Sequence, residues 1–308
     1  MVDVSDINAA LWALERKAQS HVTISALRGG TFTLPKKLFV SGASDSEHTR
    51  VPSLAFLVVH HPQAASPRRI LFDLGLRRNT KDYTLPIQNH LRNRLPMQSL
   101  PDVRQSLLEG DLSCHEIDEV ILSHVHWDHI GTPSDFAHAR FFVGAGSLDV
   151  LRDGYNGHMS HSNFQHDLFD GLNVTEFSSP DGWHVAGGLH MLDLAVGGAV
   201  YVVDSPGHLT GHIALLARKG HQQWVLLIGD ACHDIRLLTG EMSVAEWTDA
   251  EGRMCCIHMD KKQATETLEI FSQWKQASER SGIDLEIIFA HDVSWAETHL
   301  EAFFPGSL

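Results

Sequence analysis

The segment 123–129 holds the residues of this chain that are best suited to chemistry. It has the sequence Ser-His-Val-His-Trp-Asp-His and follows a short apolar run. Alternate side chains of an extended segment share a face, so His124 and His126 can point at one ion. A turn after His126 can bring Asp128 and His129 toward a neighbouring ion. Imidazole and carboxylate ligands suit zinc and its first-row neighbours. The alternative is a polar strand end with solvated histidines, but so dense a cluster beside an apolar strand is costly without a metal.

Four further segments combine a candidate ligand with an apolar or glycine-containing stretch. They are Leu71-Phe72-Asp73-Leu74-Gly75, Ser205-Pro206-Gly207-His208-Leu209-Thr210-Gly211-His212, Ile228-Gly229-Asp230-Ala231 and Ala290-His291-Asp292. Together with the His-x-His-x-Asp-His run, and in this order along the chain, they resemble the motifs of the metallo-β-lactamase superfamily. The resemblance spans about residues 53 to 292, and five ordered motifs make it highly specific.

The resemblance implies a site for two divalent metal ions. It assigns three histidines to the first ion, an aspartate and two histidines to the second, and a further aspartate to the bridging position. These groups are His124, His126 and His208, then Asp128, His129 and His291, and finally Asp230. Asp73 would accept a hydrogen bond from a ligand imidazole, and His212 would support the loop instead of binding metal. Zn²⁺ is the expected metal, with Mn²⁺, Fe²⁺ and Co²⁺ as alternatives.

Within the superfamily, the residues around Asp230 favour one subgroup. Lactam-antibiotic hydrolases tend to carry cysteine or serine near this position. The N-acyl-homoserine-lactone lactonases resemble the chain better, through the P-G-H-x-x-G-H segment and the G-D-A run. The resemblance therefore implies a quorum-quenching type of hydrolase, in which a metal-bridging hydroxide attacks and opens a lactone ring. Asp128 would orient the hydroxide and carry its proton to the leaving group. The alternatives are a lactamase acting on a small cyclic amide and a thioesterase of the glyoxalase-II type.

One position departs from the lactonase pattern. Bacterial lactonases typically have a tyrosine three residues after the bridging aspartate, and this chain has His233 there. An imidazole can also donate a hydrogen bond, so we expect His233 to assist the substrate oxyanion or ring. The substitution also indicates that the substrate differs from the bacterial signal lactones, and a related cyclic ester or cyclic amide fits this difference.

The elements that must position these residues form two strand-rich halves, each followed by helical segments. Together with the resemblance, this pattern predicts an α/β fold: an αββα sandwich of two mixed sheets packed face to face with helices outside. A hairpin is expected around the Gly29-Gly30 pair, and another joins 53–60 to 69–73. The clearest helix covers 260–280, and a closing helix covers 294–303 with Ser294 as its N-cap.

The organisation of the chain is expected to be simple. Residues 1–308 are predicted to form a single domain, with an N-terminal arm or helix over 1–20. Segments 77–110, 154–170 and 241–259 are predicted to be loop elaborations near the site, because unstructured stretches of that length in a folded domain are often functional.

Composition restricts the partners. The net charge is −14, which disfavours nucleic acid and anionic membranes. The four cysteines form no C-x-x-C pair, and no signal peptide or membrane-spanning run is visible, so a reduced, cytoplasmic chain is expected. The expected partner is a small cyclic ester or amide, and a homodimer is the oligomer that the resemblance to lactonases suggests.

Overall fold

Two six-stranded sheets form the centre of the computed structural model, which describes residues 3–62, 66–154, 163–179, 181–194 and 196–308. The first sheet has the order β1 (Val22–Pro35), β2 (His48–His60), β3 (Arg68–Phe72), β4 (Glu119–Ile121), β5 (Arg140–Gly144) and β6 (Val174–Phe177). The second has the order β14 (Asp284–Ile288), β11 (Gln223–Leu227), β10 (Ile213–Gly220), β9 (Val200–Asp204), β8 (Leu189–Asp193) and β7 (Trp183–Ala186). Both sheets mix parallel and antiparallel pairs. In the first sheet, for example, β3 pairs parallel with β4 and antiparallel with β2.

Alternation along the strands explains why the two sheets face each other. In β1 the apolar residues Val22, Ile24 and Ala26 point into one buried cluster, and Leu215 and Ala217 of β10 belong to the same cluster. Successive side chains of a strand point to opposite faces, so the residues that alternate with this cluster along the strands face outward. The intervening residues of both sheets, such as Leu57 and Leu216, belong to a second buried cluster that includes helix residues, so each sheet is covered on both faces.

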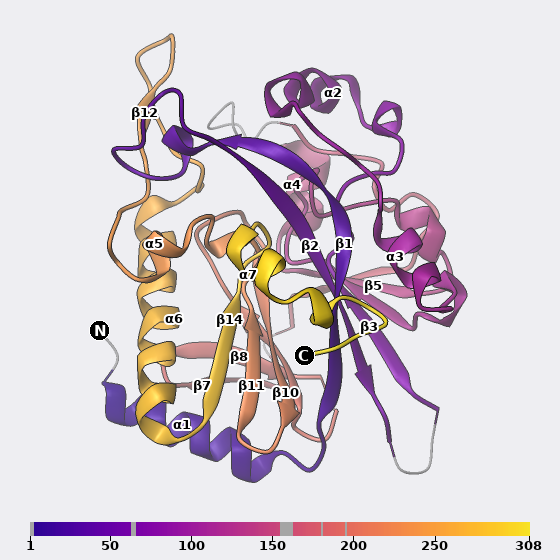
Figure 1. Cartoon of the computed structure of the whole chain (residues 1–308), viewed down its shortest axis with the longest axis vertical. Helices are drawn as coiled ribbons and strands as arrows, with labels where there is room; N and C mark the ends of the chain where they lie inside the picture. The colour runs from indigo at the N-terminus through magenta and orange to yellow at the C-terminus, as the bar shows by residue number, and fades with distance from the viewer. Residues whose placement is uncertain (1–2, 63–65, 155–162, 180, 195) are drawn as a thin grey trace.

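Helices cover the outer faces. Figure 1 shows α1 (Val4–Lys17) and α6 (Lys261–Ser281) beside the second sheet, and α3 (Val103–Glu109) and α4 (Ser147–Asp153) on the side of the first sheet. The other α-helices are α2 (Leu85–Leu91), α5 (Ile235–Leu238) and α7 (Val293–Thr298). Short 3₁₀ turns are η1 (Lys36–Leu38), η2 (Thr80–Asp82), η3 (Arg92–Arg94), η4 (Cys114–Glu116), η5 (Pro133–Phe136), η7 (Gly229–Ala231) and η8 (Leu300–Ala302). The predicted αββα sandwich is confirmed.

Two local predictions were wrong. The Gly29-Gly30 pair does not turn a hairpin but forms a register shift inside the long strand β1. A Cβ on Gly29 would lie 2.4 Å from the Ser53 carbonyl oxygen, so glycine is required there by close backbone approach. The closing helix is capped by Asp292, whose side chain accepts from the Trp295 N–H, and it ends at Thr298.

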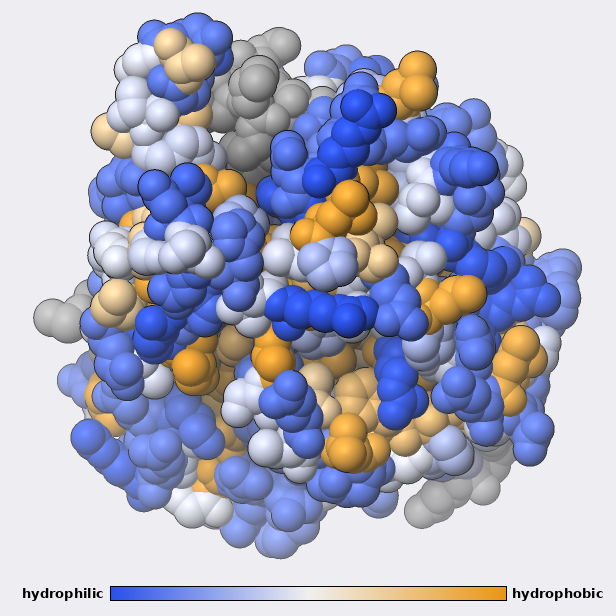
Figure 2. Space-filling model, turned by 45° about the horizontal axis from the view of Figure 1, so that its top comes forward, coloured by the Kyte–Doolittle hydropathy of each residue, from blue (hydrophilic) through white to orange (hydrophobic). Residues whose placement is uncertain are grey.

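The predicted elaborations contain regular structure where they are described. Segment 77–110 holds η2, α2, η3 and α3, and segment 241–259 holds the small hairpin of β12 (Trp247–Thr248) and β13 (Met254–Cys255) at the top of Figure 1. Residues 155–162 of segment 154–170 lie outside the described residues. The face shown in Figure 2 is mainly hydrophilic with small hydrophobic patches. None of the described helices is long and apolar enough to cross a membrane.

Candidate metal centre

The candidate ligands all follow the ends of strands and meet at one place. His124 and His126 follow β4, His208 follows β9, Asp230 lies in η7 after β11, and His291 follows β14. These residues and their partners form two groups in which the ligand atoms lie within 4.8 Å of one another. The groups are His124, His126, His208 and Asp230, and then Asp128, His129, Asp230 and His291, all of them buried. The structure therefore brings together all seven residues that the sequence motifs single out, and Asp230 is common to both groups.

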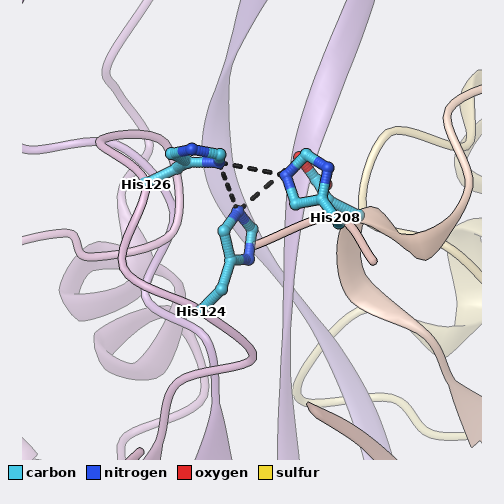
Figure 3. A group of neighbouring side chains, drawn as sticks. His124, His126 and His208 are labelled. Atoms are coloured by element: carbon cyan, nitrogen blue, oxygen red, sulfur yellow. Dashed lines mark hydrogen bonds and ion pairs between the residues drawn. The ribbon is translucent and has the colours of Figure 1, made fainter. Parts of the chain in front are cut away.

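Three imidazoles of the first group turn their ring nitrogens toward one another (Figure 3). His126 Nδ1 lies 2.9 Å from His124 Nε2 and 3.0 Å from His208 Nε2. Two nitrogen ligands of one tetrahedral zinc ion, each about 2.1 Å from the metal, lie about 3.4 Å apart. The three nitrogens thus converge with nearly the spacing of ligands around a single ion.

The two carboxylate oxygens of Asp230 divide between the groups. Oδ2 lies 3.8 Å from His124 Nε2 and 3.6 Å from His208 Nε2. Oδ1 lies 3.1 Å from both His129 Nε2 and His291 Nε2. One carboxylate facing two sets of imidazoles with different oxygens has the geometry expected of a bridging ligand.

Hydrogen bonds on the outer ring nitrogens fix the tautomers. Asp73 Oδ2 accepts from His129 Nδ1 at 2.8 Å and from the Ser123 hydroxyl at 2.8 Å. Because that hydroxyl donates to Asp73, it accepts from His124 Nδ1, 3.0 Å away. His291 Nδ1 donates to the Pro52 carbonyl at 2.8 Å. A neutral imidazole has one N–H, so the inner nitrogens of these three rings carry lone pairs.

The lone pairs of His129 and His291 face the Asp230 carboxylate instead of a hydrogen-bond donor. Neither His129 Nε2 nor Asp230 Oδ1 has a hydrogen-bond partner among the described residues, although both atoms are buried. Two buried acceptors 3.1 Å apart repel each other unless a cation lies between them. The residues present therefore fit divalent metal ions, and their imidazole and carboxylate donors suit zinc-like metals.

His212 holds the backbone of the second sheet instead of reaching the ligand groups. Its Nδ1 donates to the Ser205 carbonyl at 2.9 Å, and its Nε2 accepts from the Asp230 N–H at 3.2 Å. Gly229 makes this approach possible, because it has a φ of 50° and a Cβ there would lie 2.9 Å from the Ser123 side chain. His212 thus positions Asp230 through its backbone, with both ring nitrogens satisfied.

Burial and neighbouring charges shift the pKa values of the ligand histidines in opposite directions. Burial, reinforced by the surrounding histidines, holds the pKa of His124 and of His208 well below the usual value, so both rings are neutral at neutral pH. For His129 burial opposes the proton, but the carboxylates of Asp230 and Asp73 outweigh it and raise the pKa well above its usual value. The second group therefore attracts positive charge strongly, which a metal ion can supply in place of protons.

His233 lies beside the bridging carboxylate. Its Nε2 donates to Asp230 Oδ2 at 3.0 Å, and its ring packs against Phe39 with centroids 4.8 Å apart. Its Nδ1 is buried and has no partner among the described residues. In the neutral form with Nε2 protonated, Nδ1 is an acceptor, so it would accept from a substrate N–H or O–H.

Sequence reasoning missed one residue next to the ligands. His258, from segment 241–259, places its Nδ1 3.1 Å from His208 Nδ1, and its ring is buried. It belongs to none of the motifs, so its position along the chain gave no signal. Only the fold of the elaborated segment brings it to the site.

A cavity opens over the two groups. Besides the ligand residues it is lined by aromatic and aliphatic side chains and by a few polar ones. They are Phe32, Leu34, Leu38, Phe39, Trp127, Trp247 and Ile257, together with His90, Arg94, Asn163 and His233. An apolar pocket with a few polar groups over a metal site is the usual form of a small-molecule site.

Comparison with known proteins identifies sequence relatives, although no protein-family model matches the chain. The metallo-hydrolase mfmC of Annulohypoxylon moriforme is 31% identical over 195 residues, covering 61% of this chain and 50% of that protein. The gamma-lactamase FDB1 of Fusarium pseudograminearum is 28% identical over 212 residues, covering 65% and 50%. The cytochrome P450 monooxygenase mpaDE' of Penicillium brevicompactum is 29% identical over 198 residues, covering 61% and 22%. The chain thus spans half or less of the length of these relatives.

Solved structures share the fold over most of the chain. A mutant of B. thuringiensis AiiA, solved with N-decanoyl-L-homoserine bound at its active site, aligns with a TM-score of 0.66 at 17% identity, covering 94% of this chain and 100% of that one. The dizinc quorum-quenching lactonase AidC aligns with a TM-score of 0.58 at 14% identity, covering 88% of each chain. The hydrolase AbOPH of the beta lactamase superfamily aligns at 0.53 with 17% identity, covering 88% and 87%. The chain therefore shares the fold of these hydrolases and is similar in sequence to a metallo-hydrolase and a gamma-lactamase.

Proposed function

We propose that the chain is a metal-dependent hydrolase that opens the ring of a small lactone. The observation that carries the proposal is the pair of ligand groups that share Asp230, with buried lone pairs facing a carboxylate. Among the described residues, neither His129 Nε2 nor Asp230 Oδ1 has a hydrogen-bond partner, whereas divalent ions would satisfy both atoms. The lactonases of similar fold support the lactone as substrate.

In this proposal His124, His126 and His208 hold one ion, Asp128, His129 and His291 hold the other, and Asp230 bridges them. Ions at such a site supply a hydroxide nucleophile at neutral pH and polarise the substrate carbonyl. Zinc is the proposed metal. The homodimer, the single domain, the cytoplasmic location and the quorum-quenching role stay predictions from the sequence.

The chain's own residues would orient the reaction. Asp128 lines the cavity, and its Oδ2 lies 3.5 Å from His291 Nε2. From there this oxygen would accept a hydrogen bond from the nucleophile and pass its proton to the leaving alkoxide. His233 Nε2 holds Asp230 Oδ2, and the aromatic cavity wall excludes water around the ring.

A cyclic amide is the second candidate substrate. FDB1, one of the relatives, is named as a gamma-lactamase. The unpartnered Nδ1 of His233 would also suit an amide, because it would accept from the N–H of the ring or of the leaving amine. This arrangement differs from a tyrosine hydroxyl, which can donate to the substrate.

A hydrolysis panel on protein of known metal content tests the proposal. One γ-lactone, one γ-lactam and one glutathione thioester would be assayed with the wild type, with Asp230→Asn and with the exposed control Asp153→Asn. We expect ring opening of the lactone by the wild type and the control, and loss of both metal and activity in Asp230→Asn. Preference for the lactam or the thioester would select that alternative. Full lactone hydrolysis by metal-free Asp230→Asn would refute the proposed site.

A further inference from the structure

We propose that Arg94 is a specificity-determining residue that binds an anionic group of the substrate, so that the natural substrate is a cyclic ester or amide carrying a carboxylate. This inference rests on the proposed function and specifies its substrate class. Arg94 lies at the end of η3, in the elaborated segment 77–110, outside every motif of the metal site.

The guanidinium of Arg94 is buried, and no counter-ion for it is found among the described residues. The residue is 7% exposed, and within the described part of the chain its side chain makes one hydrogen bond, from Nη1 to the carbonyl of Asn93 at 3.3 Å. No carboxylate of the described residues lies within ion-pair distance of it, although buried arginines are almost always paired. By contrast Arg218, another arginine with little exposure, has Glu15 2.6 Å away. A guanidinium offers five N–H donors in a planar fork, so most of the donors of Arg94 remain for a ligand.

Arg94 lines two neighbouring spaces that share part of their walls. One is the cavity over the metal groups, and the other is an adjacent space whose lining includes residues of α2. The residues common to the two are Leu38, His90, Arg94, Asn163 and Trp247. These five residues form the boundary between the two spaces, called here the neck. A group bound to Arg94 would therefore lie at the neck while the rest of the molecule reached the metal groups.

The surroundings make Arg94 the dominant anion-binding group of this neck. It is the only lysine or arginine among the described residues that line either space. Burial, together with the charge of Arg94, lowers the pKa of the adjacent His90 to about 4, so that ring is neutral at neutral pH. Apolar walls such as Leu38 and Trp247 strengthen a charge-assisted hydrogen bond by excluding water.

Arg94 has one competing role, which is to balance the charge of Asp128. Asp128 is the carboxylate that acts on Arg94 electrostatically, although it is too far away for an ion pair. If balancing were its only role, loss of Arg94 would affect every substrate equally. An anion subsite instead predicts an effect confined to substrates that carry the anion.

A matched pair of probes separates these roles. The probes are 5-oxotetrahydrofuran-3-carboxylate and the uncharged 5-oxotetrahydrofuran-3-carboxamide, two γ-lactones that differ only in the charged group. The variants are Arg94→Met, Arg94→Lys and the control Arg92→Met, which changes an exposed arginine of the same turn. The metal-loaded wild type should prefer the carboxylate. Arg94→Met should lose about 10- to 100-fold in kcat/KM for the carboxylate, mainly through KM, and less than about threefold for the carboxamide. Arg94→Lys should lose less, and Arg92→Met should match the wild type.

Binding of a non-hydrolysable pair distinguishes failure of the subsite from failure of the proposed function. Calorimetry with tetrahydrofuran-3-carboxylate and its carboxamide requires no ring opening. If neither lactone is hydrolysed but the wild type binds the carboxylate more tightly and Arg94→Met does not, the subsite stands and the proposed function fails. Equal binding of both compounds by the wild type, or equal losses for both lactones in Arg94→Met, would overturn the inference. The comparison within the wild type does not depend on whether any variant folds.

Discussion

Asp73 controls the tautomers of both ligand groups, so Asp73→Asn tests the site without removing a ligand. The carboxylate accepts from the Ser123 N–H at 2.6 Å, the Ser123 hydroxyl at 2.8 Å and His129 Nδ1 at 2.8 Å. An asparagine has the same shape, but one oxygen becomes an NH₂ donor. If the amide oxygen faces the Ser123 N–H, the NH₂ group faces two other donors, the Ser123 hydroxyl and the N–H at His129 Nδ1. His129 would then have to lose its proton from Nδ1 and gain one at Nε2, where it could no longer bind a metal.

The expected cost is large for metal binding and smaller for folding. Loss of a partner behind a ligand typically lowers metal affinity about 10- to 100-fold, and each unsatisfied buried donor costs about 1–3 kcal/mol of stability. Zinc affinity would be measured by competition with a chelator, and folding by thermal denaturation. Asp102→Asn is the matched control, because Asp102 is also buried and hydrogen-bonded but pairs with Arg78 away from the site. Wild-type zinc affinity in a folded Asp73→Asn would refute the assigned tautomers.

Two further substitutions and one labelling experiment test other parts of the structure. His258→Ala should weaken zinc binding about 10-fold or more, because His258 contacts His208 Nδ1; unchanged affinity in the chelator assay would contradict this. The Glu15 carboxylate accepts hydrogen bonds mainly from Arg218, and these lower its pKa from 4.5 to about 2. Its stabilising contribution is therefore present above pH 4.5 and is lost as pH falls toward 2. Urea denaturation should therefore show Glu15→Gln to be less stable than the wild type at pH 7, with the difference shrinking at pH 3; a constant difference would argue against it. Burial raises the pKa of Cys232 to about 12, so a thiol reagent at pH 8 should label it only after unfolding, whereas fast labelling of the native protein would count against its burial.

The sequence predicted the parts of the site that follow strand ends. Residues such as His124 and Asp230 come directly after apolar strands, and such ends meet at one edge of a sandwich, so motif and fold reinforce each other. The hairpin of β2 and β3 was predicted for a similar reason, since two apolar runs flank a short turn. The N-cap of the closing helix was assigned to Ser294 instead of Asp292, because Ser294 also has a capping residue type and is followed three residues later by a glutamate.

Features that depend on contacts between distant segments were beyond sequence reasoning. Gly29 is a glycine because the backbone at Ser53 approaches it, and nothing local distinguishes this from a turn. His258 and Arg94 lie in elaborated segments whose paths are set by packing, not by periodicity. The substrate side of the site was therefore less predictable than the metal side, because a motif specifies the ligands but not the walls of the cavity.

The central claim is that Asp230 joins two metal ions. Anomalous diffraction at the absorption edge of the bound metal tests it directly. Two peaks about 3.5–4 Å apart are expected, with one oxygen of Asp230 coordinated to each. A single peak, or two ions without Asp230 among their ligands, would contradict the account.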